Sequence, residues 1–119
     1  MAAGGIGLIV ITLVGIGMAA IGWLGWLERL PPNHFAGIRT PFTMRSPENW
    51  YRTHHAAAPL LIFGGIAVVA VGISCIPFAV ADKLPVGFVR VVMSAQVGMV
   101  LASAFVSWKV GVSAAKRGK

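Results

Sequence analysis

The chain has 119 residues, of which 57% are hydrophobic and only 11% are charged, and its formal net charge is +7. Its mean hydropathy of +0.83 lies well above that of soluble domains. This composition excludes an ordinary soluble protein and predicts an integral membrane protein too short to carry a separate soluble domain.

Three apolar runs are long enough to cross a bilayer as helices, since a core of roughly 30 Å needs about 20 residues. They cover residues 4–27, 56–81 and 86–108. We expect an all-α fold, in which residues 1–119 form a single membrane domain, a three-helix bundle with a long structured cytoplasmic loop at 28–55. No Lys or Arg precedes Ile6, and the first run exceeds the core of a leader peptide, so we expect it to be retained.

Small residues recur at helical spacing in all three runs. They are Gly15, Ala19 and Gly22 in the first, Gly64 and Gly72 in the second, and Ser94, Gly98 and Ala102 in the third. Apolar helices associate in lipid mainly through close approach at small residues. We therefore expect these faces to pack within the chain, with a homo-oligomer as the alternative.

The connection after the first run contains strong signals for turns and for a helix start. Gly37 permits a tight or left-handed turn. Ser46 is a good N-cap, and Pro47 suits the first helical position. The helix that this predicts places Trp50 and His54 on one face. The sequence leaves open whether residues 46–55 form an interfacial helix or extend the second span.

Arg39 lies beside two threonines, Thr40 and Thr43, in this connection. Together they offer donors suited to a phosphate, a carboxylate or a peptide carbonyl. The alternative is that these donors satisfy the backbone of the loop itself. The sequence does not choose between these two interpretations.

Two prolines and a short turn shape the second run. Pro59 and Pro77 each lack an N–H and crowd the preceding turn, which predicts a kink or a late helix start. The turn at residues 82–85 is so short that the second and third spans must form an antiparallel hairpin.

The third run contains two polar residues. Arg90 lies close enough to the end of the run to reach the headgroups. Gln96 lies deeper and needs a partner on another helix, for which Thr12 and Ser74 are candidates. No Asp or Glu lies in any run, so a carboxylate relay for protons or cations is not available.

Basic residues are concentrated on one side of the predicted membrane. With three crossings, the first loop and the C-terminal tail share a side, which carries Arg29, Arg39, Arg45, Arg52, Lys109, Lys116, Arg117 and Lys119, whereas the other side carries Lys83. The positive-inside rule places this side in the cytoplasm and the N-terminus outside. Topology and anionic lipids account for the net charge, so we expect no nucleic-acid partner.

Aromatic residues follow the same boundary. Trp23, Trp26, Trp50, Tyr51 and Trp108 flank the predicted spans on that side, where we expect all five to anchor the chain at the interface.

The sequence does not indicate catalysis or metal binding. His54 and His55 point about 100° apart on a helix, and no cysteine or acid completes a metal site with His34. Ser74 and Cys75 have no base within their own span. We expect no enzymatic activity, cofactor or metal.

The polar connection also carries a distinctive spacing of residue types. It comprises Asn33, Gly37-Ile38-Arg39-Thr40-Pro41, Thr43, Ser46, Trp50 and Thr53-His54. This pattern resembles the signature of the SdpI immunity-protein family. The resemblance implies a multi-pass protein of the bacterial cytoplasmic (inner) membrane. It also implies ligand or partner binding by Asn33, Gly37, Arg39, Thr40, Thr43, Trp50 and His54.

The family's namesake protects producing cells from a secreted peptide toxin and draws a cytoplasmic autorepressor to the membrane. The resemblance therefore suggests toxin immunity or envelope stress signalling, through binding of a partner or a lipid headgroup at the loop. Membrane lipids, a cytoplasmic regulator or another membrane protein are the expected partners. The alternative is an accessory subunit of a larger transporter or respiratory assembly, and a small-molecule transporter is least favoured.

Overall fold

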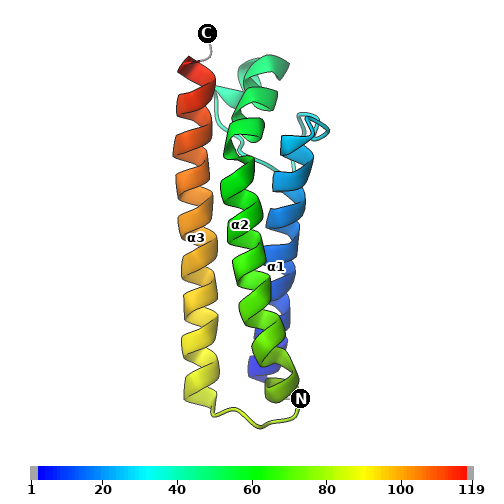
Figure 1. Cartoon of the computed structure of the whole chain (residues 1–119), viewed down its shortest axis with the longest axis vertical. Helices are drawn as coiled ribbons and strands as arrows, with labels where there is room; N and C mark the ends of the chain where they lie inside the picture. Colours follow the sequence, from blue (N-terminus) through cyan, green and yellow to red (C-terminus); the bar gives the residue numbers. More distant parts are fainter. Residues whose placement is uncertain (1–2, 118–119) are drawn as a thin grey trace.

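The computed structural model describes residues 3–117 as a bundle of three long helices. The elements are α1 (Ala3–Trp26), a short 3-10 helix η1 (Thr43–Arg45), α2 (Pro47–Val80) and α3 (Val86–Arg117). The bundle is elongated, with extents of 53 × 20 × 20 Å. Figure 1 shows the three helices side by side, with α2 between α1 and α3. The all-α prediction is confirmed, since the described residues contain no strand.

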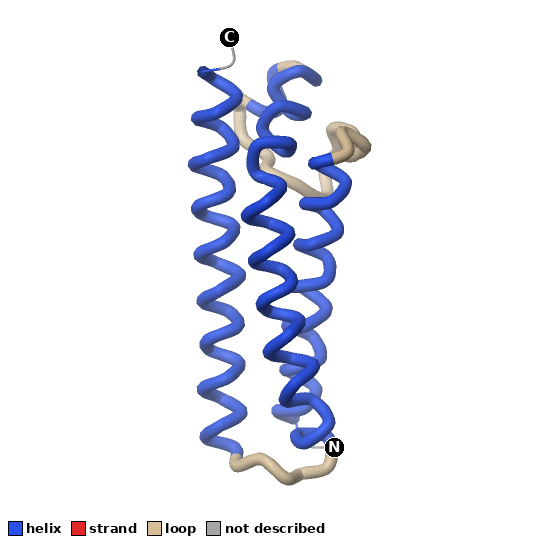
Figure 2. The backbone as a smooth tube through the Cα atoms, viewed as in Figure 1, coloured by secondary structure: helices blue, strands red, loops and turns tan. Residues whose placement is uncertain are grey.

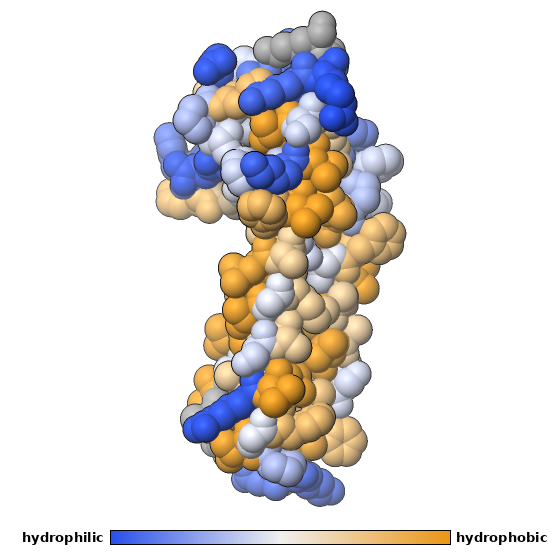
Figure 3. Space-filling model, turned by 90° about the vertical axis from the view of Figure 1, so that its left-hand side faces the viewer, coloured by the Kyte–Doolittle hydropathy of each residue, from blue (hydrophilic) through white to orange (hydrophobic). Residues whose placement is uncertain are grey.

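All three helices are long and apolar enough to cross a membrane. Large apolar side chains lie mainly on the outside of the bundle, including Leu13, Phe63, Val91 and Leu101. Lipid is as apolar as these side chains, so a membrane helix gains little by turning them inward. Figure 3 shows this apolar surface along the stem and a hydrophilic surface at the end that carries the C-terminus.

Glycines bring α1 and α2 into close contact, as the sequence predicts. A Cβ added to Gly65 would lie 2.5 Å from the carbonyl oxygen of Gly15 and 2.7 Å from the amide nitrogen of Ala19. A Cβ at Gly22 would lie 2.9 Å from the amide nitrogen of Ile62. The two backbones are therefore too close for larger side chains at these positions.

The corresponding prediction for α3 is wrong. Ser94, Gly98 and Ala102 are exposed, and nothing in the structure lies within 4 Å of a Cβ added to Gly98. The helix instead turns Gln96 and Ser107 inward, and both are fully buried. Burial of the amide of Gln96, which is costly to leave facing lipid, decides the orientation of this helix.

Gln96 joins the three helices near the middle of the bundle. Its Nε2 donates to the carbonyl oxygen of Val68 on α2 at 3.0 Å and to Oγ1 of Thr12 on α1 at 3.4 Å. Of the two side chains predicted as partners of Gln96, Thr12 is therefore the one that binds it. The hydroxyl of Ser74 instead donates to the carbonyl of Ala70 in its own helix, at 2.8 Å.

Helix α2 begins at Pro47, not at residue 56, so the predicted loop at 28–55 is too long. The connection covers residues 27–46, and residues 46–55 belong to the cap and the first turns of α2. Ser46 Oγ accepts the N–H of Asn49 at 3.1 Å, which is the predicted N-cap. The helix continues through Pro59 and Pro77, so of the predicted kink or late start, the late start is wrong.

Helix α3 also extends beyond its predicted end at residue 108, to Arg117. Gly111 permits this extension to pack against the start of α2, because an added Cβ would lie 2.7 Å from the carbonyl oxygen of Thr53. Lys116 Nζ lies 5.3 Å from the centre of the Phe42 ring in the connection. We call residues 27–58 and 108–117 together the head.

Two non-glycine residues in the left-handed region end the first two helices. Glu28 has φ +57°, and the Arg29 N–H returns to the carbonyl of Leu24 at 2.9 Å. Asp82 has φ +55° and ends α2 in the same way. Both ends follow the Schellman pattern. The short turn after Asp82 confirms the predicted antiparallel hairpin of α2 and α3 (Figure 2).

Candidate functional site

A buried pair of rings on the first turns of α2 holds the connection in place. The Ile38 N–H donates to His54 Nε2 at 2.8 Å, and His54 Nδ1 lies 2.7 Å from the carbonyl oxygen of Trp50. A carbonyl only accepts, so the proton of this imidazole is on Nδ1 and Nε2 is free to accept. His54 therefore binds the loop through a side chain that is 1% exposed.

Trp50 makes the second attachment. Its Nε1–H donates to the carbonyl of Leu30 at 2.7 Å, and its ring lies 4.2 Å from the ring of His54, tilted by 35°. The predicted common face of these two side chains is confirmed. Trp50 is fully buried, however, so the expectation that it anchors the chain at the lipid interface is wrong. The carbonyl of Leu30 satisfies its indole N–H inside the protein.

Gly37 lets the loop backbone lie directly on these rings. Its φ is +113°, in a region that other residues rarely adopt. An added Cβ would lie 2.7 Å from Nε2 of His54 and 3.0 Å from Cη2 of Trp50. A glycine is therefore required here both for its backbone angle and for its size.

Thr43 holds the other side of the same peptide segment. Its hydroxyl donates to the carbonyl of Ile38 at 2.8 Å and accepts the N–H of Thr40 at 2.8 Å. Thr43 is fully buried. The two threonines thus satisfy the backbone of the loop, which was one of the two interpretations that the sequence left open.

Asn33 organises the outer turn of the connection. Its Oδ1 accepts the N–H groups of Phe35 and Ala36, both at 2.8 Å, and its Nδ2 donates to the carbonyl of Pro31 at 2.9 Å. The turn holds the side chain of Phe35 95% exposed. Phe35 was not among the binding residues predicted from the sequence, although its place two residues after a turn-forming asparagine indicates an exposed position.

Arg39 differs from the other six predicted binding residues. It is exposed, and within residues 3–117 it makes no hydrogen bond or ion pair. By contrast, Arg52 pairs with Glu48 at 2.7 Å. We call Asn33, Gly37, Thr40, Thr43, Trp50 and His54 the clamp, because they fix the segment that carries Arg39.

A second aromatic contact ties α1 to the head. The ring of His55 stacks on that of Trp26, with centroids 4.4 Å apart and planes 14° apart, and His55 Nδ1 lies 2.9 Å from the carbonyl oxygen of Trp26. Trp23 and Trp26 are about half exposed.

Among the described residues, no three His, Cys, Asp or Glu side chains come together as a metal site.

Basic residues are concentrated in the head, which also contains the clamp. The described part of the head carries Arg29, Arg39, Arg45, Arg52, Lys109, Lys116 and Arg117, against Glu28 and Glu48. Figure 3 shows the resulting hydrophilic surface. The head is therefore positively charged and suited to an anionic ligand or surface.

A family model described as the SdpI/YfhL protein family matches residues 29–111. The chain belongs to this family. Comparisons with curated proteins and with solved structures give no significant match. The match to the SdpI/YfhL family includes the connection from Arg29 onward, all of α2, and α3 as far as Gly111, the residue that packs against Thr53. It thus contains the whole clamp and the contact that joins α3 to the head.

Proposed function

We propose that this protein is a non-enzymatic member of the SdpI/YfhL family that acts in toxin immunity or envelope stress signalling through its head. In this proposal the head faces the cytoplasm of a bacterium whose inner membrane the three helices cross. The excess of Lys and Arg at this end supports the orientation through the positive-inside rule. Family membership supports the functional class.

The observation that carries the proposal is the contrast between Arg39 and the clamp. The polar groups of Thr43, Trp50 and His54 all bind the loop backbone, which leaves them little capacity to recognise a ligand. Arg39 is held on this fixed segment with its guanidinium exposed. Because the backbone that carries Arg39 is already fixed, a partner does not have to order it, and the guanidinium can donate two parallel hydrogen bonds to a carboxylate.

We therefore assign Arg39 the contact with a partner and the clamp the task of presenting it. The partner in this proposal is a protein, either a cytoplasmic regulator or another membrane protein, with an acidic group at its contact surface. The threonine and tryptophan residues that the sequence suggested as ligand contacts act indirectly, because they set the position of the arginine.

A challenge with secreted, membrane-active peptide toxins tests this proposal. We expect deletion of the gene to raise sensitivity and the Arg39→Ala variant to restore little protection. The Arg45→Ala variant is the matched control, since Arg45 is also exposed but lies at the end of η1, beyond the backbone of residues 38–40 that the clamp holds. Immunoblots of membranes establish that both variants accumulate equally. Unchanged sensitivity in both the deletion and the Arg39→Ala strain would contradict the proposal.

The second candidate is an accessory subunit of a larger membrane assembly. The observation in its favour is the exposed small-residue face of α3, at Ser94, Gly98 and Ala102, which the described part of the chain leaves uncovered. Gentle detergent extraction separates the two candidates. Migration with a single large complex favours the subunit, whereas a small species favours immunity or signalling.

A further inference from the structure

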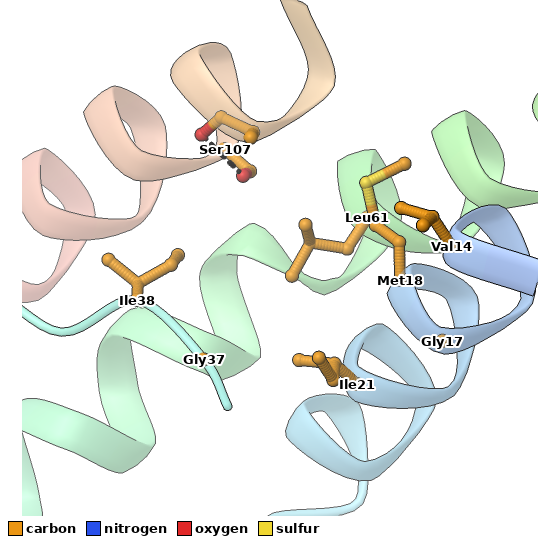
Figure 4. Close-up of a pocket in the computed structure, with 9 residues that line it drawn as sticks. Val14, Gly17, Met18, Ile21, Gly37, Ile38, Leu61 and Ser107 are labelled. Carbon is orange, nitrogen blue, oxygen red and sulfur yellow. Dashed lines mark hydrogen bonds between the residues drawn. The ribbon is translucent and has the colours of Figure 1, made fainter. Parts of the chain in front are cut away.

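An apolar groove lies between α1 and α3, in the half of the bundle next to the head. Its volume is about 300 Å³. Figure 4 shows side chains from three helices and from the connection around it. The helices contribute Val14, Gly17, Met18, Ile21, Leu61, Ala104 and Ser107, and the connection contributes Gly37 and Ile38.

The groove exists because α1 and α3 each pack on α2 and make far fewer contacts with one another. Gly17 widens it, since nothing lies within 4 Å of a Cβ added there. Leu61 forms part of its floor and is nearly buried. In a bilayer, this apolar space opens toward the lipid chains.

The clamp covers the end of the groove. Gly37 and Ile38 line it there, and Ile38 is held in place because its N–H donates to His54 and its carbonyl accepts the hydroxyl of Thr43. Along α1 the groove extends from Val14 to Ile21, which is about 10 Å at 1.5 Å per residue. This is about a third of the hydrocarbon thickness of roughly 30 Å.

The length and the lining of the groove decide whether a transmembrane helix or a lipid chain fits it. A transmembrane helix from a partner or from a second copy crosses the whole hydrocarbon core, which is about three times the length of the groove. A lipid chain is narrower and needs to fill only one leaflet. The only polar side chain in the lining is Ser107, whose hydroxyl donates to Ala104 in its own helix at 3.0 Å. The space therefore suits a hydrocarbon chain.

We propose that one acyl chain of an anionic phospholipid occupies this groove, with its phosphate at the basic surface of the head. The head supplies the charge complementarity through seven basic residues against two acidic ones. The acyl chain can leave the groove through its open, lipid-facing side, which lets the headgroup pass the covering residues Gly37 and Ile38 and reach this basic surface. This inference does not depend on the role in immunity.

The Gly17→Leu variant fills the groove without displacing any neighbour, because the space beside Gly17 is empty. Gly98→Leu is the matched control. Gly98 also lies in a helix with nothing within 4 Å, but on the outer face of α3, away from the groove. Leucine favours a helix more than glycine does, so both variants retain the fold. Circular dichroism and thermal unfolding in detergent check this.

The test uses purified protein reconstituted in vesicles that contain phosphatidylglycerol and phosphatidylcholine in equal amounts, then extracted in mild detergent for native mass spectrometry. We expect the wild type and Gly98→Leu to retain phosphatidylglycerol in preference to phosphatidylcholine, and Gly17→Leu to lose it. Equal lipid retention by Gly17→Leu and the wild type would overturn the proposal. So would retention without preference for phosphatidylglycerol, or a dimer that only Gly17→Leu disrupts.

Discussion

At the residue scale, the clamp shows how one short segment can be fixed by side chains far along the chain. The amide and the carbonyl of Ile38 are bound by His54 and by Thr43, respectively. The sequence predicted that these residues bind a ligand or partner, and that Trp50 and His54 share a face. It did not predict that their partners would be the loop backbone, because the partner atoms lie up to 20 residues away, as for Trp50 and Leu30.

The role of His54 can be isolated by replacing it with phenylalanine. Phe keeps an aromatic ring that can pack on Trp50 but has no ring nitrogen, so the Ile38 N–H loses its acceptor. An unpaired buried N–H costs about 1 to 3 kcal/mol. We expect faster hydrogen–deuterium exchange at the Ile38 amide in His54→Phe. Exchange in the His55→Phe control should match the wild type, and equal exchange in all three proteins would contradict this role.

Gly37→Ala tests the backbone requirement. The positive φ disfavours alanine by about 1 to 3 kcal/mol, and the new methyl group would also displace His54. We expect a lower free energy of unfolding in detergent. Gly98→Ala serves as the control, because its Cβ meets nothing and alanine favours the helix, so its stability should not fall. A stable Gly37→Ala protein would show that the loop is not held as described.

At the element scale, helix type and number follow from the apolar runs, whereas helix ends and orientations do not. The sequence predicted a helix start at Ser46 but left open whether this helix continues into the second span, because residues 47–55 are polar. In the structure it does continue, and Asn49, Thr53 and His54 are buried inside the head. The orientation of α3 was also mispredicted. A small-residue pattern identifies a face able to pack closely, but the need of Gln96 for interhelical partners determined which face turned inward.

Gln96→Leu tests that explanation. The substitution keeps much of the side-chain volume but removes the donors to Val68 and Thr12. Interhelical hydrogen bonds in membrane proteins contribute about 0.6 to 2 kcal/mol. We expect a loss of that size in the free energy of unfolding in detergent. Ser74→Ala is the control, because that hydroxyl bonds only within α2. Equal stability of both variants would contradict the assigned role of Gln96.

At the scale of the whole molecule, the chain consists of an apolar stem and a polar, basic head. Length and composition predict the stem almost completely, since each run needs only to be long and apolar. The head was less predictable, because its two separate parts of the chain, residues 27–58 and 108–117, meet through Gly111, and the first part folds back on itself at Gly37. Arg39 was identified from its residue type, but only the structure distinguishes it from the residues that position it.

The central claim is that the clamped segment with Arg39 faces the cytoplasm. Cys75 is a free thiol, so a Cys75→Ser background removes it before single cysteines are introduced. The measurement compares labelling by a membrane-impermeant maleimide in intact and in permeabilised cells. We predict that Arg39→Cys is labelled only after permeabilisation, whereas Lys83→Cys, at the opposite end of the bundle, is labelled in intact cells. Labelling of Arg39→Cys in intact cells would contradict the account.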